Sequence, residues 1–535
     1  MGRRMAKEVY IAAVGLTKVD LTGRIFASIF DLFAEAYRKA LEDSSVRSFD
    51  AVQVGIMDSE EFENRANIAA KIVDRLGLTG VPAIRTETAS STGAAALHEA
   101  YYKVASGECE NVLVLAGERM KMVTTEVATQ IMSKTVDPEE RRFGFTMPSL
   151  IALVTQAWLR QRGIRGPQTA SVLSRLMHRA HALGADNPLA AFHGKRETIE
   201  SYFDAERNLP VATPLMRKDC SPICDGAAAM IVTSRPQAVR IAAAASATET
   251  SSILDRQVLT NLEATTRAAE IAYWRAGIAR PRELEGLVVE VHDAFNSLLP
   301  IGLVDLGLAD PDDVIAMLVG DAALIGKEPV SPYDHPYTGP RGRMPTNMSG
   351  GLKARGHPVG GTGLFQIAEN YLQITERFPN PAAQVRGARI GISNSIGGPG
   401  NNNYVTVLES ASSRRRREKV AKPRLQFESS RRRPERAGMA GLDGASATVE
   451  AATTIHVRAG GGEPLHVALL SIGGRRVFAK MDHPPREGER VEEVLAGRKV
   501  NLLVKDDGDQ YFQIPRGRAF DLGGVVAAIR RRVGG

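Results

Sequence analysis

The chain has 535 residues, of which 43% are apolar and 24% charged, with 50 glycines and a net charge of +7 at neutral pH. This length is too great for one ordinary domain, and the composition is that of a globular α/β protein, so two or three cores are expected. No apolar run reaches the about 20 residues needed to cross a bilayer, which excludes a membrane-spanning helix.

An alternation of strands and helices begins at the N-terminus. Residues 8–15 are predicted as a buried strand, and apolar residues from Phe26 to Leu41 recur at the spacing of an amphipathic helix. The next predicted elements are a strand at 51–57, a helix at 63–77, an extended stretch at 81–88, a helix at 91–108 and a strand at 111–118. Strands that alternate with helices indicate a mostly parallel sheet covered on both faces.

The same pattern recurs further along the chain. Its predicted elements are a helix at 263–278, a strand at 284–295, a Gly-rich turn with a small-residue helix at 356–373 and a closing strand at 387–395. Each half contains a Gly or Ser turn that enters a helix of small residues, which indicates internal duplication. We therefore predict an N-terminal half over 1–240 and a C-terminal half over 241–409. Residues from about 119 to 240 are less regular and are predicted as a loop-rich insertion, the usual place for substrate contacts.

The regular pattern ends near Glu409, and residues 410–450 are predicted as a basic, flexible linker because they are rich in Ser, Arg, Pro and Gly. Within this stretch, segment 413–436 contains 11 Arg or Lys and three Glu, so the remainder of the chain is close to neutral. A folded body with a basic surface is therefore not expected. A run of this kind is most often solvated linker, and phosphate binding is the alternative.

Residues 451–535 are predicted as a separate module. Short strand-like segments recur at roughly ten-residue spacing and are separated by Gly, Pro and Asp, which is typical of a small antiparallel β-barrel, here an OB-like module. The segments are TIHVRA, LHVALLSIG, RRVFAKMDH, RKVNLLVKDD and QYFQIPRG.

The three cysteines, Cys109, Cys220 and Cys224, are too few for a disulfide framework or a four-thiolate zinc site. The CxxxC pair also lacks the other ligands that zinc requires, so no metal site is expected. The basic N-terminus runs directly into a strand and has no apolar signal core. These features predict a reducing, cytoplasmic location.

The strongest motif is NMSGGLKARGHPVGGTG at 347–363. A GHP triplet alone fits a Gly-rich turn with a chance histidine, but the whole string closely resembles the histidine motif of the thiolase superfamily. Three other stretches resemble thiolase segments in family order: the Asp-Gly-Ala-Ala-Ala segment at 214–232, the oxyanion-hole turn VHDAF at 291–295 and the closing loop NSIGGPG at 394–400. The resemblance covers about residues 7–409 and is greatest to the sterol-carrier-protein-type and archaeal-type thiolases.

This resemblance implies a fold of two similar α/β halves in a five-layered αβαβα sandwich. It also implies acyl transfer on coenzyme A thioesters, with acyl-CoA as substrate or ligand and no covalently bound cofactor. His357 would match the histidine that activates the nucleophile, and His292 would match the first oxyanion-hole residue. The resemblance assigns substrate contacts to Ser349, Gly350, Gly398 and Gly400.

The chain departs from the family at the nucleophile. Residues 87–93 read Glu-Thr-Ala-Ser-Ser-Thr-Gly, so Ser90 stands in the position of the family's cysteine. The second acid/base position falls at Asn394, whose amide cannot readily transfer a proton at neutral pH. A cysteine thiol with a pKa of about 8.5 ionises easily at a helix N-terminus, whereas serine must lose its proton to an adjacent base. His357 could serve, but the sequence identifies no carboxylate that would orient it; the alternative is that Ser90 or a neighbour only caps the next helix.

Three hypotheses for function follow. The first is a thiolase-like acyltransferase without the cysteine-dependent thiolase reaction, and the second is a non-catalytic protein that binds acyl-CoA or a partner thiolase. The third, ranked well below them, is nucleic-acid binding by the barrel and the basic linker, because Phe478, Tyr511, Phe512 and Phe520 are few for stacking. A homodimer, a complex with a thiolase and a monomer all remain open.

Some thiolase-like acyltransferases work with a small OB-fold partner that carries a zinc ribbon. Residues 454–520 resemble the barrel of such a partner fused to the same chain. They contain no cysteine, so the zinc ribbon is absent.

Overall fold

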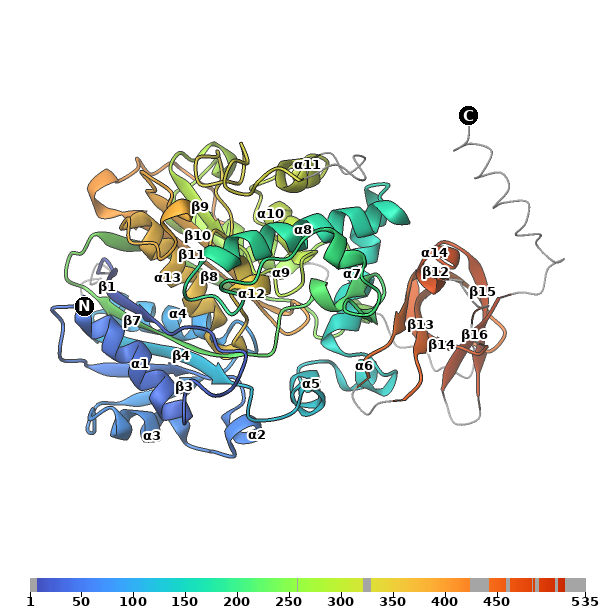
Figure 1. Cartoon of the computed structure of the whole chain (residues 1–535), viewed down its shortest axis with the longest axis horizontal. Helices are drawn as coiled ribbons and strands as arrows, with labels where there is room; N and C mark the ends of the chain where they lie inside the picture. The colour runs from blue at the N-terminus through green and yellow to red at the C-terminus, as the bar shows by residue number, and fades with distance from the viewer. Residues whose placement is uncertain are drawn as a thin grey trace. The chain divides into compact units, whose positions relative to one another are not determined.

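The computed structural model divides the chain into two compact units (Figure 1). Unit 1 comprises Met1–Arg433 and Ile455–Pro464, and unit 2 comprises Pro434–Thr454 and Leu465–Gly535. The structure describes residues 7–256, 258–320, 329–423, 442–458, 462–483, 485, 490–505 and 509–514.

Unit 1 contains two α/β halves. The elements of the first half are β1 (Tyr10–Leu16), α1 (Ile29–Glu42), β2 (Ala51–Gly55), α2 (Ser59–Glu63), α3 (Ile68–Arg75), β3 (Ala83–Thr86), α4 (Thr92–Ser106), β4 (Asn111–Arg119) and β7 (Asp225–Thr233). Those of the second half are β8 (Val239–Thr248), α9 (Glu263–Ala276), β9 (Leu287–Glu290), α10 (Leu298–Asp305), α11 (Val314–Val319), α12 (Gly351–Ala354), α13 (Thr362–Ile374), β10 (Ile390–Gly397) and β11 (Asn402–Ser410).

The strand order shows that the two halves repeat one another. Within the continuous order β3-β2-β4-β7-β1-β8-β11-β10-β9, the first five strands belong to the first half and the last four to the second. If the strands of each half are numbered along the chain, with the third number left vacant in the second half, the order from the outer edge inward is 3-2-4-5-1 in the first half and 2-4-5-1 in the second. A parallel bridge between Val289 and Thr346 lies where the missing third strand would pair. The internal duplication inferred from the sequence therefore extends to the topology.

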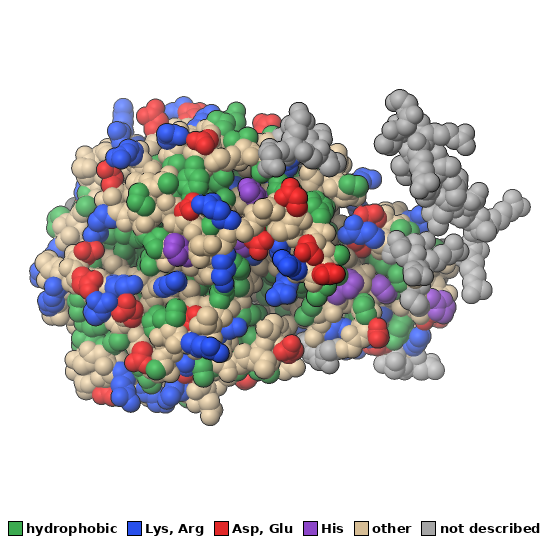
Figure 2. Space-filling view, in the orientation of Figure 1, with side chains coloured by type: hydrophobic (Ala, Val, Ile, Leu, Met, Phe, Trp, Pro, Cys, Tyr) green, Lys and Arg blue, Asp and Glu red, His purple; other side chains and the backbone are tan. Residues whose placement is uncertain are grey.

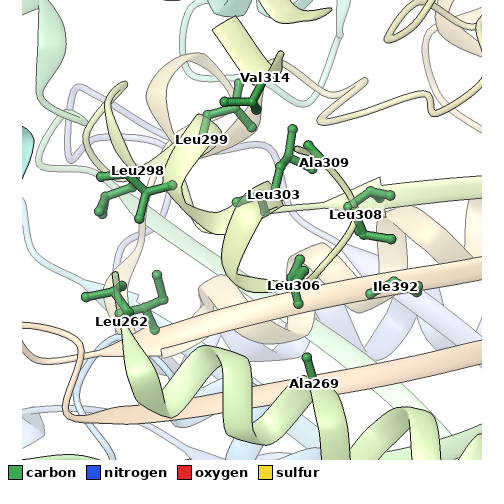
Figure 3. Close-up of a cluster of buried hydrophobic side chains, with 14 of the residues drawn as sticks. Leu262, Ala269, Leu298, Leu299, Leu303, Leu306, Leu308, Ala309, Val314 and Ile392 are labelled. Atoms are coloured by element: carbon green, nitrogen blue, oxygen red, sulfur yellow. The ribbon is translucent and has the colours of Figure 1, made fainter. Parts of the chain in front are cut away.

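Helices cover the strands in layers. Helices α1 and α3 pack on one face of the first half, and α4 and α13 share a second apolar cluster with β1, β4 and β7. A third cluster joins α9 and α10 to the strands of the second half; Figure 3 shows Leu298 and Leu303 of α10 together with Ala269 of α9 and Ile392 of β10. The predicted five-layered αβαβα arrangement is confirmed.

The two central helices approach each other closely where both begin. A Cβ atom on Gly93 of α4 would lie 2.8 Å from the backbone nitrogen of Leu364, and one on Gly363 of α13 would lie 2.6 Å from that of Ala94. Glycine is required at both positions because any side chain would force the helices apart. This crossing places the turn before α4 next to the turn before α13.

The insertion between β4 and β7 differs from its prediction as loop-rich. Its elements are α5 (Thr125–Ser133), α6 (Pro138–Arg142), α7 (Met147–Gln161), α8 (Pro167–Asp186), β5 (Pro210–Ala212) and β6 (Leu215–Met216). Helices α7 and α8 each have a proline in the first turn, where its missing N–H costs nothing. Helix α8 is largely buried, and its buried residues include Arg175, Arg179 and His181.

The first part of the predicted linker is bound to unit 1. Arg415 donates to the carbonyls of Ala276 and Gly277 at the end of α9, and Arg414 pairs with Glu8 at 2.8 Å. Cations at a helix C-terminus offset its exposed carbonyl dipoles. Figure 2 shows Lys and Arg side chains interspersed with Asp and Glu over the visible face.

Unit 2 is a closed five-stranded barrel, which confirms the predicted module. Its elements are β12 (Ser446–Ile455), β13 (Leu465–Ile472), β14 (Arg475–Met481), α14 (Val491–Val494), β15 (Lys499–Val504) and β16 (Gln510–Gln513). The order β13-β14-β16-β15-β12 closes through a pairing of β12 with β13. One pair, β14 with β16, is parallel, so the barrel is not antiparallel throughout. Strand β12 begins at Ser446, inside the stretch that the sequence assigns to the linker.

The aromatic residues of the barrel are mostly structural. Phe478 and Phe512 are buried in it, and the ring of Tyr511 has Lys505 at 3.7 Å. Phe520 lies outside the described residues. A row of exposed stacking rings, which single-strand binding needs, is not found among the described residues of the barrel. None of the helices in the described part of the chain combines the length and apolar character that a bilayer span requires.

Candidate active site

His357 is buried in the turn between α12 and α13. Its peptide N–H donates to Cys224 Sγ at 3.2 Å, and its ring Nδ1 lies 2.7 Å from Oγ1 of Thr362, the first residue of α13. When Nδ1 carries the ring proton, it donates to Thr362 and leaves the Nε2 lone pair free to accept. Thr362 therefore occupies the place of the orienting carboxylate that the sequence does not provide.

His292 lies in the turn that follows β9. Its Nδ1 accepts a hydrogen bond from the Ile396 peptide N–H at 3.3 Å, so a neutral ring carries its proton on Nε2. The His292 and His357 rings are perpendicular, with centroids 5.2 Å apart. The two histidines predicted from separate motifs thus meet, one with an Nε2 donor and the other able to present an Nε2 acceptor.

Both imidazoles are held neutral. Burial lowers the pKa of His357 to about 3, and the nearby Arg355 cation acts in the same direction. Burial also lowers the pKa of His292 well below its ordinary value, helped by His357 and Arg355. A neutral imidazole can accept a proton or donate a hydrogen bond to developing negative charge, and both roles are available at pH 7.

Ser90 is half-buried at the turn before α4. The preceding residue, Ala89, has a φ of +54°, a conformation that costs an L-residue about 1–2 kcal/mol. Hydroxyls of the neighbours hold this turn: Ser91 donates to the Thr88 carbonyl at 2.7 Å, and Thr92 donates to the Ala89 carbonyl at 2.6 Å. The backbone strain sits directly beside the position of the family's nucleophile.

Among the residues that the structure describes, His357 included, none forms a hydrogen bond with the Ser90 hydroxyl. Ser90 does not cap α4 either, because Ser91 is the N-cap residue and forms no side-chain capping bond. The capping interpretation therefore does not explain Ser90, and no Ser–His pair is formed in this state.

Asn394 is fully buried in β10 and supports the backbone of the site. Its Oδ1 accepts the peptide N–H of His292 at 3.2 Å, and its Nδ2 lies 3.4 Å from Thr265 Oγ1. The amide is thus used to position the His292 turn. In the closing loop that follows, a Cβ on Gly397 would lie 2.3 Å from the Thr88 carbonyl, so the loop lies directly against the Ser90 turn.

The four predicted substrate-binding residues lie in close-packed backbone. Gly350 has a φ of +95°, and its Cβ would lie 2.7 Å from Gly184 in α8. Ser349 is buried, and its carbonyl accepts from Asn187. Gly398 and Gly400 have φ values of +57° and +96°, and both allow the closing loop to turn.

A pocket of about 770 Å³ borders the turn that precedes α4. The turn residues Thr88 and Ala89 and the loop residues Gly397 and Gly398 form part of its wall. Its charged lining residues are Asp58, Arg85, Glu87, Lys134 and Glu249. The volume suits a drug-sized ligand, but sequence reasoning missed these residues because they come from separate segments with no common motif.

The cysteines do not replace the missing nucleophile. Burial raises the pKa of Cys220 and of Cys224 to about 12, so both remain thiols at neutral pH. Cys109 is also buried, and burial raises its pKa. Within the described ranges, no three His, Cys, Asp or Glu side chains are grouped so as to bind a metal ion.

Comparisons with known proteins identify the family of the chain. Residues 9–171 match the family pattern described as "Thiolase, N-terminal domain", and residues 245–410 match "Thiolase C-terminal domain-like". An acetyl-CoA acetyltransferase of Methanothermobacter thermautotrophicus is 33% identical over 410 residues, covering 74% of this chain and 99% of the relative. Sterol carrier protein 2 of Gallus gallus is 27% identical over 415 residues, covering 74% and 70%.

Among solved structures, a monomeric SCP2-thiolase like protein type 1 from Mycobacterium smegmatis has a TM-score of 0.69 at 18% identity, covering 95% of this chain and 99% of that one. The sequence matches span both halves, including the two histidine turns and the closing loop. The chain therefore belongs to the thiolase family.

Proposed function

We propose that this protein is an acyltransferase of the thiolase type that acts on coenzyme A thioesters without the cysteine-dependent thiolase reaction. The observation that carries the proposal is the perpendicular contact of His292 and His357, with ring centroids 5.2 Å apart. The acyltransferase name of the archaeal relative supports the same reaction class. The thioester itself supplies the acyl group, and no further cofactor is needed.

In the proposed reaction, His292 Nε2–H donates to the thioester carbonyl oxygen and stabilises the negative charge that develops there. His357 Nε2 takes the proton from the acceptor as the acceptor bonds to the carbonyl carbon. The C–S bond then breaks, and coenzyme A leaves as the thiol after receiving that proton. The acceptor is either Ser90, which would give an acyl-enzyme, or a second molecule bound directly.

A second candidate is a non-catalytic protein that binds acyl-CoA or pairs with an active thiolase. Two observations favour it: the Ser90 hydroxyl has no hydrogen bond to His357, and the Asn394 amide is used by the His292 backbone. In this alternative the two imidazoles hold the thioester carbonyl without a proton transfer.

Incubation with acetyl-CoA and longer acyl-CoAs separates the two candidates. An acyltransferase should release coenzyme A faster than His357→Ala does, and intact-protein mass spectrometry should show an acyl adduct that Ser90→Ala lacks if Ser90 is the acceptor. Thioester binding without release in either protein supports the binding protein. The absence of both binding and release contradicts the proposal.

A further inference from the structure

Two buried polar side chains next to the histidine turns lack partners. Lys353, in α12, is four residues before His357 and only 3% exposed, and His181, in α8, is 2% exposed. In the part of the chain that the structure describes, Lys353 Nζ has neither a hydrogen bond nor an ion pair, and both ring nitrogens of His181 are unpaired. Buried polar groups are nearly always paired, so two such groups close together require an explanation.

Both side chains contact the ring of Phe192. Lys353 Nζ lies 5.1 Å from the ring centroid, and the His181 ring lies 4.6 Å from it, edge to face. The Phe192 backbone is fixed to α12, because its N–H donates to the Ala354 carbonyl at 3.2 Å. Phe192 itself keeps part of its surface accessible, whereas Lys353 and His181 of this cluster lie beneath the surface.

The cluster adjoins the residues that carry His292. Cys220, which is among the titratable groups that face Lys353, forms an antiparallel bridge with Phe295, three residues after His292. Next to this bridge, the Ser221 N–H donates to the Ala294 carbonyl at 2.8 Å. Cys220 is partly accessible as well. The unpaired groups and the imidazole pair therefore share one region.

No neighbouring acid neutralises Lys353. The titratable groups that face it are Cys220 and Asp219, together with Glu197 and Asp293. Each carboxylate is already used: Glu197 pairs with Lys218 at 2.7 Å, Asp219 accepts from Tyr202, and Asp293 accepts from the Leu352 N–H. Burial without a partner lowers the pKa of Lys353 to about 8, so the amine remains mostly charged at pH 7.

We propose that Lys353 and His181 bind a carboxylate carried by the acyl group of the coenzyme A thioester, with Phe192 packed against the acyl chain. This inference rests on the proposed function. An ammonium and an imidazole N–H are two donors that suit one carboxylate. The phosphates of coenzyme A also offer anionic oxygens, but they lie at the far end of the pantetheine arm from the thioester.

The test compares the dissociation constants of succinyl-CoA and butyryl-CoA, whose acyl chains differ in a terminal carboxylate or methyl, by titration calorimetry. The wild type should bind succinyl-CoA about ten- to a hundredfold more tightly, the range of a charge-assisted hydrogen bond. Lys353→Met should lose this preference while binding butyryl-CoA unchanged. The matched control, Lys39→Met, removes a lysine of α1 that is paired with Glu35 and should keep the preference.

Each of the remaining outcomes contradicts either the carboxylate site or the proposed function. Equal binding of both thioesters by the wild type overturns the carboxylate site and leaves the proposed function standing, whereas binding of neither refutes the proposed function. If Lys353→Met weakens free coenzyme A as much as succinyl-CoA, the bound anion is a phosphate and the carboxylate assignment is wrong.

A measurement on the wild type covers the case in which Lys353→Met fails to fold. The preference for succinyl-CoA should fall as the pH rises past the Lys353 pKa of about 8, because the neutral amine no longer attracts a carboxylate. A preference that does not change with pH across this range overturns the proposal.

Discussion

Gly351 gives a sharp test of how the two histidine turns are joined. It begins α12 with a φ of +60°, and a Cβ at this position would lie 2.2 Å from Oδ2 and 2.5 Å from Oδ1 of Asp293. Asp293 Oδ1 in turn accepts the Leu352 N–H at 2.7 Å. Gly351→Ala must therefore push Asp293, and with it the His292 turn, away from the turn that carries His357.

The loss in the free energy of unfolding of Gly351→Ala has two parts. The positive φ costs an alanine about 1–2 kcal/mol, and overpacking against a buried carboxylate adds about 1–3 kcal/mol. Gly163→Ala is a matched control, because Gly163 has a φ of +73° with nothing within 4 Å of its added Cβ. It should show only the first part, so Gly351→Ala should be less stable than the control by about 1–3 kcal/mol.

Urea unfolding followed by tryptophan fluorescence measures this difference. Both tryptophans of the chain, Trp158 and Trp274, belong to unit 1, so the signal reports on the unit that contains the site. Acyl-CoA affinity should also fall in Gly351→Ala and not in Gly163→Ala. Equal unfolding free energies for the two variants would show that the Asp293 contact is not rigid, and the reasoning from the close approach would be wrong.

Three further predictions concern the site itself. Thr362→Val should leave Nδ1 of His357 without a partner and slow coenzyme A release about ten- to a hundredfold, while Thr362→Ser keeps the rate; nitrogen NMR of the ring should show the tautomer change only in the valine variant. Because burial lowers both pKa values, His292 and His357 should stay neutral as the pH falls through 6.5, the ordinary value for histidine, and an NMR titration with a midpoint near 6.5 for either ring would contradict this. Ser90→Cys should leave acetoacetyl-CoA thiolysis at background, since the Asn394 amide still cannot transfer a proton; strong activity would show that the remaining machinery is intact.

The meeting of the two histidines could be predicted because each lies in a motif whose local structure is strongly determined. Glycines and a proline surround His357, and His292 follows a buried strand, so the turn at each position is specified by nearby residues. Both turns belong to the second half, in which α13 packs against β9. The contact of Thr362 with His357 could also have been predicted, because Thr362 lies inside the histidine motif at the start of the predicted helix.

Other features depend on contacts between distant segments. The Ser90 turn is shaped by the approach of Gly397 to the Thr88 carbonyl, and residues more than 300 positions apart leave no local pattern. The docking of Arg415 onto the end of α9 was missed for the same reason. Its charge run predicted solvated linker, whereas the carbonyls of Ala276 and Gly277 offer it partners that only the folded chain brings near.

The electrostatics of the site bear on the proposed role of serine at position 90. A cysteine nucleophile is most effective as a thiolate paired with a cation, and imidazolium is the cation that an adjacent histidine can supply. Here burial and Arg355 lower the pKa of His357 to about 3, so an imidazolium is disfavoured before the reaction begins. A neutral histidine that acts as general base for a hydroxyl does not require an ion pair before the reaction, because the proton is transferred only as the new bond forms. With the histidine held neutral, a thiol at residue 90 would gain no thiolate–imidazolium pair, although it would remain the more acidic acceptor. The proposed transfer to serine therefore depends on removal of the hydroxyl proton by His357 as the new bond forms.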